Sequence, residues 1–175
     1  MRKLLLFSLS IIYFSLQSQN STTVNWISFE EAVKKNETSP KKFLIDVYTD
    51  WCGWCKKLDA TTFKNQTIAA YINEYFWAVK LDAEYPDTIK LGSQIFINEN
   101  PNARRSAHQL AIALLNGKMT YPSIVYLDEN LELLQAIPGY YDASGIEPIL
   151  TFFGDDIYKR QSFDDFKTVF SSNMK

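Results

Sequence analysis

The feature that most constrains the fold of this chain is a pair of cysteines that follows closely on a strongly apolar segment. The apolar segment, residues 43–48 (FLIDVY), is typical of a central strand buried on both faces of a sheet. The cysteines, Cys52 and Cys55, stand three positions apart at the start of a helical pattern expected over residues 52–63. A strand that leads at once into a helix predicts an α/β arrangement around the two thiols.

This position gives the two cysteines a chemical use beyond packing. A thiolate is the nucleophile in disulfide exchange, and a free thiol with a pKa of about 8.5 is mostly protonated at neutral pH. At a helix N-terminus, unpaired N–H groups and the positive end of the helix dipole stabilise the thiolate of Cys52. Cys55, nearly one helical turn later, can close a disulfide with Cys52 or resolve a mixed disulfide. We expect Cys52 to be exposed to substrate and Cys55 to be the more buried partner.

Other uses of a cysteine pair fit this sequence less well. A disulfide that closes so short a loop constrains the unfolded chain very little, which makes it a poor structural cross-link. A structural zinc site needs four ligands, and the rest of the sequence offers only His108 as a strong candidate. Covalent haem attachment needs a histidine where Lys56 stands, and no nearby His or Met completes a copper site. We expect no metal and no cofactor other than a redox-active disulfide, with His108 a surface or partly buried side chain.

One charged residue, Asp46, interrupts the buried strand. Burial of a carboxylate costs free energy unless the group is paired or its pKa is raised. A carboxylate in such a position is a candidate functional group, and a structural ion pair is the alternative.

The rest of the chain alternates helical and strand patterns. Ser28 and Glu31 form a capping-box pattern at the start of a first helix. Residues 107–116 repeat apolar side chains at helical spacing, and Gly117 follows where a helix commonly ends. The other expected elements are helices over residues 29–35, 67–75 and 144–153 and strands over residues 77–82, 123–127 and 131–137, the last two joined by a turn at 128–130. This order predicts an α/β fold with a central mixed β-sheet flanked by helices.

The first residues have the layout of a secretory signal peptide. A short basic start precedes an apolar run over residues 4–16 and a polar stretch, with cleavage expected after Ser18. The run is shorter than the about 20 apolar residues that a membrane span needs. We assign residues 1–18 to a signal peptide and expect a periplasmic or secreted protein with no stable membrane anchor after cleavage.

Length and charge narrow the class further. A chain of 175 residues is long enough for one well-packed domain. Its net charge of −2 and its lack of a basic block leave no electrostatic footprint for nucleic acid. We expect a monomer that does not bind nucleic acid.

Residues 43–58 (FLIDVYTDWCGWCKKL) resemble the active-site segment of the thioredoxins, with an aspartate six residues before the first cysteine and a tryptophan directly before it. The similarity continues through residues 78–82 (AVKLD), 120–123 (TYPS) and 138–140 (PGY). Within this superfamily the chain is most similar to exported thioredoxin-like proteins that resemble the periplasmic domain of the membrane thiol:disulfide interchange reductase. The resemblance implies a thioredoxin fold.

The resemblance also implies a division of the chain. The thioredoxin-like domain is expected over residues 24–154. Its segment between Asp82 and Pro122 is longer than in a minimal thioredoxin, so a helical insertion over residues 83–119 is expected before the cis-proline strand. Residues 155–175 remain as a C-terminal helical extension, whose apolar face is formed by Phe163, Phe166, Val169 and Phe170.

Several residues match functional positions of the thioredoxins. Asp46 matches the buried acid that accepts a proton from the resolving cysteine, and Lys80 matches the lysine near that acid. For both residues a structural salt bridge is the alternative. Pro122 matches the cis-proline that faces the disulfide and helps to receive a substrate strand.

The residues next to the thiols are the expected substrate-binding residues, namely Trp51, Gly53, Trp54, Tyr121 and Pro122. Trp51 matches the family tryptophan, whereas Trp54 stands where thioredoxins have a proline. The two residues between the cysteines tune the cysteine pKa and the reduction potential, so this departure bears on reducing strength.

The resulting expectation is an exported thiol:disulfide oxidoreductase, working as a reductase, with Cys52 as nucleophile and Cys55 as resolving cysteine. Its partners would be protein disulfide substrates and an electron donor, either a membrane protein or another thioredoxin-like domain. Two alternatives stay open, a non-catalytic binding or assembly factor on a thioredoxin scaffold and a metal chaperone that uses the two thiolates.

Overall fold

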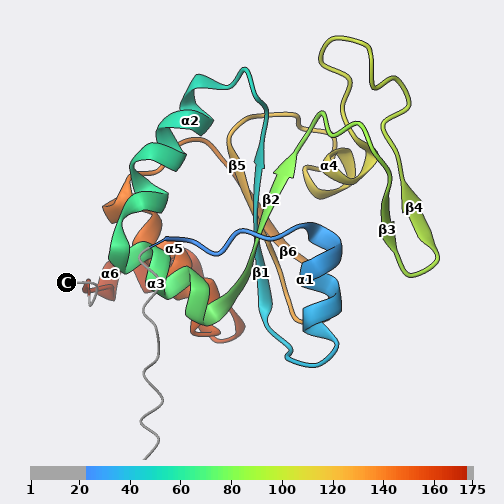
Figure 1. Ribbon diagram of the computed structural model, residues 1–175. Coiled ribbons are helices and arrows are strands. Elements are labelled where there is room, and N and C mark those ends of the chain that lie inside the picture. Colours follow the sequence, from blue (N-terminus) through green and yellow to red (C-terminus); the bar gives the residue numbers. More distant parts are fainter. Residues whose placement is uncertain (1–22, 173–175) are drawn as a thin grey trace, which may run out of the picture.

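A computed structural model describes residues 23–172, and the signal-peptide prediction for residues 1–18 lies outside this range. The centre is a four-stranded sheet with the strand order β2-β1-β5-β6, and a separate two-stranded sheet joins β3 to β4. Figure 1 shows α2, α3, α5 and α6 on one face of the central sheet and α1 and α4 on the other. The predicted α/β fold with a central mixed sheet flanked by helices is confirmed.

The elements follow one another along the chain in this order: α1 (Phe29–Asn36), β1 (Lys42–Tyr48), α2 (Gly53–Ala60), the 3-10 turn η1 (Thr62–Lys64), α3 (Gln66–Tyr75), β2 (Phe76–Asp82), β3 (Ile89–Leu91), β4 (Gln94–Phe96), α4 (Gln109–Leu114), β5 (Ser123–Leu127), β6 (Leu133–Pro138), α5 (Ala143–Gly154), the 3-10 turn η2 (Ile157–Lys159) and α6 (Phe163–Val169).

The strand β1 occupies an inner position of the sheet, as its apolar sequence predicts. It pairs in parallel with β2 and antiparallel with β5, so its backbone is hydrogen-bonded on both sides. Six of its seven residues are buried, because helices cover both faces of the sheet. The strand ends at Tyr48, four residues before Cys52, so the cysteine motif follows directly on a buried strand that is paired on both sides.

Two apolar clusters lie on opposite faces of this sheet. On one face, Leu44 and Tyr126 pack against α2, α3, α5 and α6. On the other, Phe43 and Ile45 pack against α1, β3 and α4. Successive residues of β1 alternate between the clusters, which is the period of two that a strand imposes. Within residues 23–172, no helix is long and apolar enough to cross a membrane.

The segment between β2 and β5 differs from the expectation. It contains the short hairpin β3–β4, which the sequence analysis did not predict, and a helix shortened to Gln109–Leu114. His108 is fully buried, where a surface or partly buried side chain was expected, and it caps α4. Its Nδ1 accepts from the Leu110 N–H (3.2 Å), and its Nε2–H then donates to the Asp87 carbonyl (3.1 Å).

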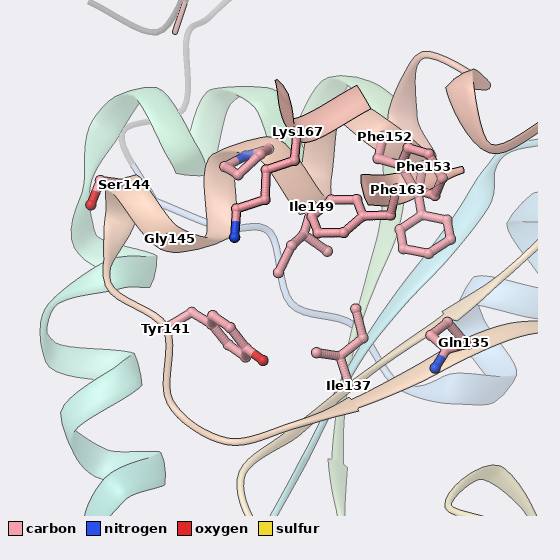
Figure 2. A pocket seen from close by; sticks show the side chains of 11 residues that line it. Gln135, Ile137, Tyr141, Ser144, Gly145, Ile149, Phe152, Phe153, Phe163 and Lys167 are labelled. Atoms are coloured by element: carbon pink, nitrogen blue, oxygen red, sulfur yellow. The ribbon is translucent and has the colours of Figure 1, made fainter. Parts of the chain in front are cut away.

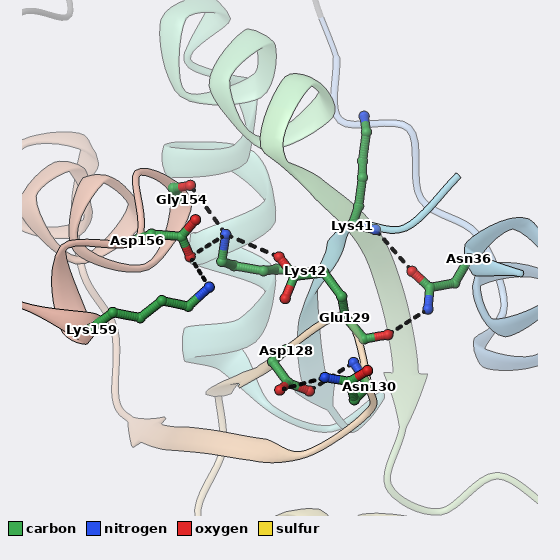
Figure 3. Close-up of polar contacts among 9 residues, drawn as sticks. All are labelled: Asn36, Lys41, Lys42, Asp128, Glu129, Asn130, Gly154, Asp156 and Lys159. Carbon is green, nitrogen blue, oxygen red and sulfur yellow. Dashed lines mark hydrogen bonds and ion pairs between the residues drawn. The ribbon is translucent and has the colours of Figure 1, made fainter. Parts of the chain in front are cut away.

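The residues after α5 pack into the domain. Phe166 of α6 is buried in the same cluster as Phe152 and Phe153 of α5. Ion pairs also connect the C-terminal segment to the sheet (Figure 3). The buried ammonium of Lys42 in β1 lies 2.8 Å from Asp156 and 3.3 Å from Glu129. The C-terminal segment therefore completes one face of the sheet.

Candidate functional site

The two cysteines form a disulfide at the N-terminus of α2. Cys52 caps this helix, and its Sγ accepts from the Cys55 N–H at 3.0 Å. The turn that precedes the helix is closed by the Cys52 N–H, which donates to the Thr49 carbonyl at 3.1 Å. Helix α2 is shorter than the predicted span because the chain turns at Thr61 into η1. The strand–turn–helix order expected from the sequence is the one observed.

Both cysteines are buried in this disulfide state. Cys55 is 1% exposed, and Cys52 is 5% exposed. The predicted order of burial is therefore correct, but the prediction that Cys52 is exposed to substrate is wrong for the oxidised form. The disulfide and the cap hydrogen bond draw the Cys52 sulfur toward the helix, which leaves only its edge accessible.

Asp46 of β1 and Lys80 of β2 form an ion pair. They are direct neighbours in the parallel β1–β2 register, and Lys80 Nζ lies 2.5 Å from Asp46 Oδ2. The same ammonium also donates to Asp59 of α2. The ring faces of Trp26 and Tyr48 lie about it, with centroids at 5.0 and 4.9 Å. Lys80 thus links Asp46 of β1 to α2, the helix that carries the cysteines.

The environment of Asp46 favours its neutral form more than water does. Burial raises the pKa of Asp46 to about 6, although the charge of Lys80 works in the opposite direction. Its second oxygen, Oδ1, is buried without a hydrogen-bond partner in the part of the chain that the structure describes, and so is Thr49 Oγ1. Oδ1 can therefore receive a proton without breaking the contact with Lys80.

Trp51 lies on one side of the disulfide and is held by three groups. Its indole N–H donates to Glu84 Oε1 at 2.9 Å. The ring meets Tyr121 edge to face, with centroids 5.8 Å apart, and the Arg105 guanidinium lies 4.7 Å from its centroid. Glu84 and Arg105 both come from the segment between β2 and β5. This segment therefore reaches the motif through contacts with Trp51.

Trp54 lies on the other side and is held by a different loop. Trp54 is 57% exposed, and its ring lies 5.4 Å from the ring of Tyr140, centroid to centroid. Lys57 Nζ stands over both rings, 4.7 Å from the centroid of Trp54 and 4.9 Å from that of Tyr140. The Tyr140 hydroxyl lies 3.2 Å from Thr61 Oγ1.

The loop before β5 connects these two sides. The Tyr121–Pro122 peptide bond is cis, and the Pro122 carbonyl accepts from the Gly139 N–H at 2.8 Å. Tyr121 contacts Trp51, and Gly139 immediately precedes Tyr140. The loop thus contacts Trp51 through Tyr121, and its hydrogen bond to Gly139 ties it to the segment whose Tyr140 contacts Trp54. Gly53 has open space beside it.

A hollow elsewhere on the molecule lies apart from the cysteine motif. A hollow of about 600 Å³ lies between β6, α5 and α6, where Figure 2 shows Lys167 and Tyr141 at its edge. None of the residues 51–55 lines this hollow. Within residues 23–172, no group of three or more His, Cys, Asp or Glu side chains is placed to hold a metal ion.

The arrangement of strand, motif and loops agrees with comparisons to known proteins. Residues 9–143 match the family Thioredox_DsbH, described as a protein of unknown function, DUF255. The chain belongs to this family. Two uncharacterized relatives are similar to parts of this chain. The one from Archaeoglobus fulgidus is 29% identical over 76 residues, which are 43% of this chain and 60% of the relative. The one from Caenorhabditis elegans is 31% identical over 80 residues, 45% of this chain and 11% of the relative. The chain thus matches less than two thirds of the length of either relative.

Solved structures share the fold of this chain at low sequence identity. A thioredoxin-fold protein from Helicobacter pylori has a TM-score of 0.58 and 18% identity, covering 86% of this chain and 89% of its own. A DsbH oxidoreductase has a TM-score of 0.55 and 14% identity, over 84% and 95% of the two chains. A putative disulphide isomerase from Bacteroides thetaiotaomicron has a TM-score of 0.52 and 22% identity, over 80% and 95%. These likenesses establish the thioredoxin fold.

The sequence did not predict several side chains that contact the motif or its neighbours in the structure. Asp59 shares Lys80 with Asp46, and its position one helical turn after Cys55 was the available signal. Tyr140 had a signal in the matching PGY segment but received no role. Glu84 and Arg105 lie far from the cysteines in sequence, and no pattern marks them.

Proposed function

We propose that this protein is an exported thiol:disulfide oxidoreductase that reduces disulfides of protein substrates. The observation that carries the proposal is the Cys52–Cys55 disulfide at the N-terminus of α2, together with the buried Asp46 carboxylate and its free oxygen. Relatives of the same fold that are named as a DsbH oxidoreductase and a putative disulphide isomerase support it. The exported location rests on the signal-peptide pattern of residues 1–18.

The exchange begins with the dithiol form of the protein. The Cys52 thiolate attacks one sulfur of a substrate disulfide, a mixed disulfide forms, and the other substrate sulfur leaves as a thiolate. The N–H groups at the start of α2 stabilise the attacking thiolate. The Cys55 thiolate then attacks the Cys52 sulfur, which releases the second substrate thiol and forms the Cys52–Cys55 disulfide.

Resolution requires that Cys55 lose its proton, and Asp46 is the proposed acceptor. A pKa of about 6 leaves this carboxylate ionised at neutral pH, yet basic enough to bind a proton at Oδ1. Lys80 holds Asp46 by the other oxygen and keeps the free one in place. Each cycle oxidises the protein by two electrons, so a dithiol electron donor, a membrane protein or a thioredoxin-like domain, must reduce it again.

The test replaces each cysteine in turn. Cys52→Ser is expected to abolish the reduction of insulin disulfides, because the nucleophile is lost. Cys55→Ser is expected to accumulate mixed disulfides through Cys52, which mass spectrometry identifies as covalent adducts. Retention of insulin reduction by Cys52→Ser contradicts the proposed function.

The reducing direction has a separate measurement, the reduction potential of the Cys52–Cys55 couple against glutathione, followed by tryptophan fluorescence. A potential near that of thioredoxin, about −270 mV, agrees with a reductase. A value near about −120 mV is that of an oxidant and contradicts the reducing role while leaving thiol exchange intact.

A further inference from the structure

The two tryptophans next to the cysteines have different charged neighbours. Trp51 contacts charges of both signs: its indole N–H donates to Glu84, and the Arg105 guanidinium lies 4.7 Å from its ring centroid. The charged group against the Trp54 ring is a cation, Lys57. A substrate chain at Trp54 therefore meets an ammonium, whereas at Trp51 it meets a carboxylate and a guanidinium together.

Lys57 has no counter-charge of its own. Its ammonium stands over the rings of Trp54 and Tyr140, and it forms no ion pair with a carboxylate anywhere in residues 23–172. Lys80, on the same side of the sheet, has two carboxylates. An ammonium held against aromatic faces keeps N–H donors free for an incoming anion.

The surface under this ammonium is apolar and fixed in place. Trp54 stands between the two cysteines in the chain, and more than half of its surface is exposed. Tyr140 is held by the contact of its hydroxyl with Thr61. The next residue, Tyr141, is held through its carbonyl, which accepts from Thr62 Oγ1 at 2.7 Å. A large aromatic surface exposed beside a reactive group is a feature of contact sites.

We propose that Trp54, Tyr140 and Lys57 form a substrate subsite for an acidic side chain close to the reacting cysteine, a step that rests on the proposed function. The methylene groups of a glutamate pack on the Trp54 and Tyr140 rings, and its carboxylate accepts from Lys57 Nζ. The preferred substrates are thus proteins whose disulfide is flanked by acidic residues.

The test uses three disulfide-linked peptide dimers in which the cysteine is flanked by Glu, Gln or Lys on both sides. For each, kcat/KM of reduction by the protein is divided by the rate of reduction by dithiothreitol, which removes the intrinsic reactivity of the peptide. The wild type is expected to prefer the Glu peptide over the Gln peptide by about two- to fivefold at low salt, as for an exposed ion pair. High salt is expected to abolish this preference.

The neighbouring residue provides a matched control. Lys56 and Lys57 are both exposed residues of α2, and no ring contact is formed by Lys56 within residues 23–172. Lys57→Gln and Lys56→Gln change the net charge of the protein equally. Lys57→Gln is expected to bring the Glu-to-Gln ratio to about one, and Lys56→Gln to retain it. An effect on the potential of the disulfide would change all three peptides by one factor and leave the ratio unchanged.

Different outcomes of these assays would contradict the subsite and the proposed function. Reduction of all three peptides at equal normalised rates, or a ratio that Lys57→Gln leaves intact, overturns the subsite and spares the proposed function. A ratio lowered equally by both variants also overturns it, since the effect would then be one of overall charge. Failure to reduce any of the peptides or insulin contradicts the proposed function itself.

Discussion

At the scale of single residues, Asp46 carries the most specific physical consequence. Its side chain is fully buried, and its pKa is raised to about 6, first by burial. An aspartate in the unfolded chain titrates near 3.9. Between these values the folded protein binds more protons than the unfolded chain, so the free energy of unfolding falls as the pH rises from about 4 to about 6.

The corresponding prediction concerns Asp46→Asn. The variant is expected to lose this pH dependence and to be more stable than the wild type at pH 7, by about 2 kcal/mol, because a buried charge is removed. At pH 4 the two proteins should differ little. Urea unfolding at both pH values measures the effect. Asp59→Asn removes the more exposed carboxylate on the same lysine and should keep the pH dependence of the free energy of unfolding. An equal pH dependence in the wild type and in Asp46→Asn would refute the raised pKa of Asp46.

At the scale of elements, α5 is fitted closely against α3. A Cβ at Gly154, the last residue of α5, would stand 2.5 Å from the Tyr71 hydroxyl and 3.0 Å from its ring carbon Cζ. The Tyr71 hydroxyl also donates to Asp155 at 2.9 Å, which fixes the ring. The absence of a side chain at position 154 is thus what allows the two helices to approach.

Gly154→Ala is therefore expected to destabilise the protein by about 1–3 kcal/mol through overpacking. Gly145→Ala in the same helix is the control, because its Cβ would meet no atom closer than Asp142 Oδ1 at 3.2 Å, with the Tyr141 side chain at 3.6 Å. Thermal or urea unfolding compares the two variants. Equal stability of both would show that the contact with Tyr71 relaxes at no cost.

The segment between β2 and β5 depends on one buried amide. The Asn98 side chain donates to the carbonyls of Ser106 (2.8 Å), Glu84 (3.3 Å) and Tyr85 (3.4 Å) and accepts from the Ser106 hydroxyl (2.6 Å). It thereby holds the backbone of Glu84 next to the loop that carries Arg105.

Asn98→Ala is expected to loosen this loop while the sheet stays folded, because three partly buried carbonyls lose their donor. Hydrogen exchange should increase in residues 97–108 and remain unchanged in β1 and β5. Asn100→Ala, a change in the same loop at an exposed side chain, is the comparison. Uniform exchange across the protein in Asn98→Ala would mean that the amide stabilises the whole domain instead.

The sequence predicts the elements that are long or strongly patterned. It does not predict features whose structure depends on contacts between segments distant in sequence. The apolar run of β1 and the helix start at Cys52 follow from local pattern, and Asp46 stands out because it interrupts that run. The hairpin β3–β4 escaped because its strands have three residues each, too few for a period to show. His108 was misplaced because its burial depends on the Asp87 carbonyl, twenty-one residues away.

The same limit applies to the candidate site. The two cysteines and Trp51 are visible in the motif, whereas the contacts of Trp54 with Tyr140 and of Trp51 with Arg105 need the folded loops. The pairing of Asp46 with Lys80 depends on the register of two parallel strands, which only the resemblance to thioredoxins could indicate.

At the scale of the whole molecule, the C-terminal segment acts as part of the domain rather than as an appendage. Lys42 is buried in β1, and its ammonium contacts Asp156, Glu129 and the Gly154 carbonyl, the last at 3.4 Å. These three groups come from the start of the tail, the β5–β6 turn and the end of α5. One cation therefore joins four parts of the chain.

Lys42→Met is expected to destabilise the protein by about 1–3 kcal/mol at neutral pH. The loss is moderate because both carboxylates are partly exposed to water and Asp156 keeps Lys159 at 2.9 Å. Urea unfolding measures the change, with Lys41→Met as the adjacent control. A more stable Lys42→Met protein would show that the desolvation of the ammonium outweighs its ion pairs.

The contact between Lys42 and Asp156 also bears on when the domain can finish folding during protein synthesis. The first strand of the chain is completed by residues made more than a hundred positions later, and the aromatic cluster of α5 is closed by Phe166 of α6. Contacts so distant in sequence cannot form while their second half is still inside the ribosome. A nascent chain that has reached the end of α5 thus contains both cysteines but an unfinished domain. Its thiols are made long before the tail that completes the fold around them.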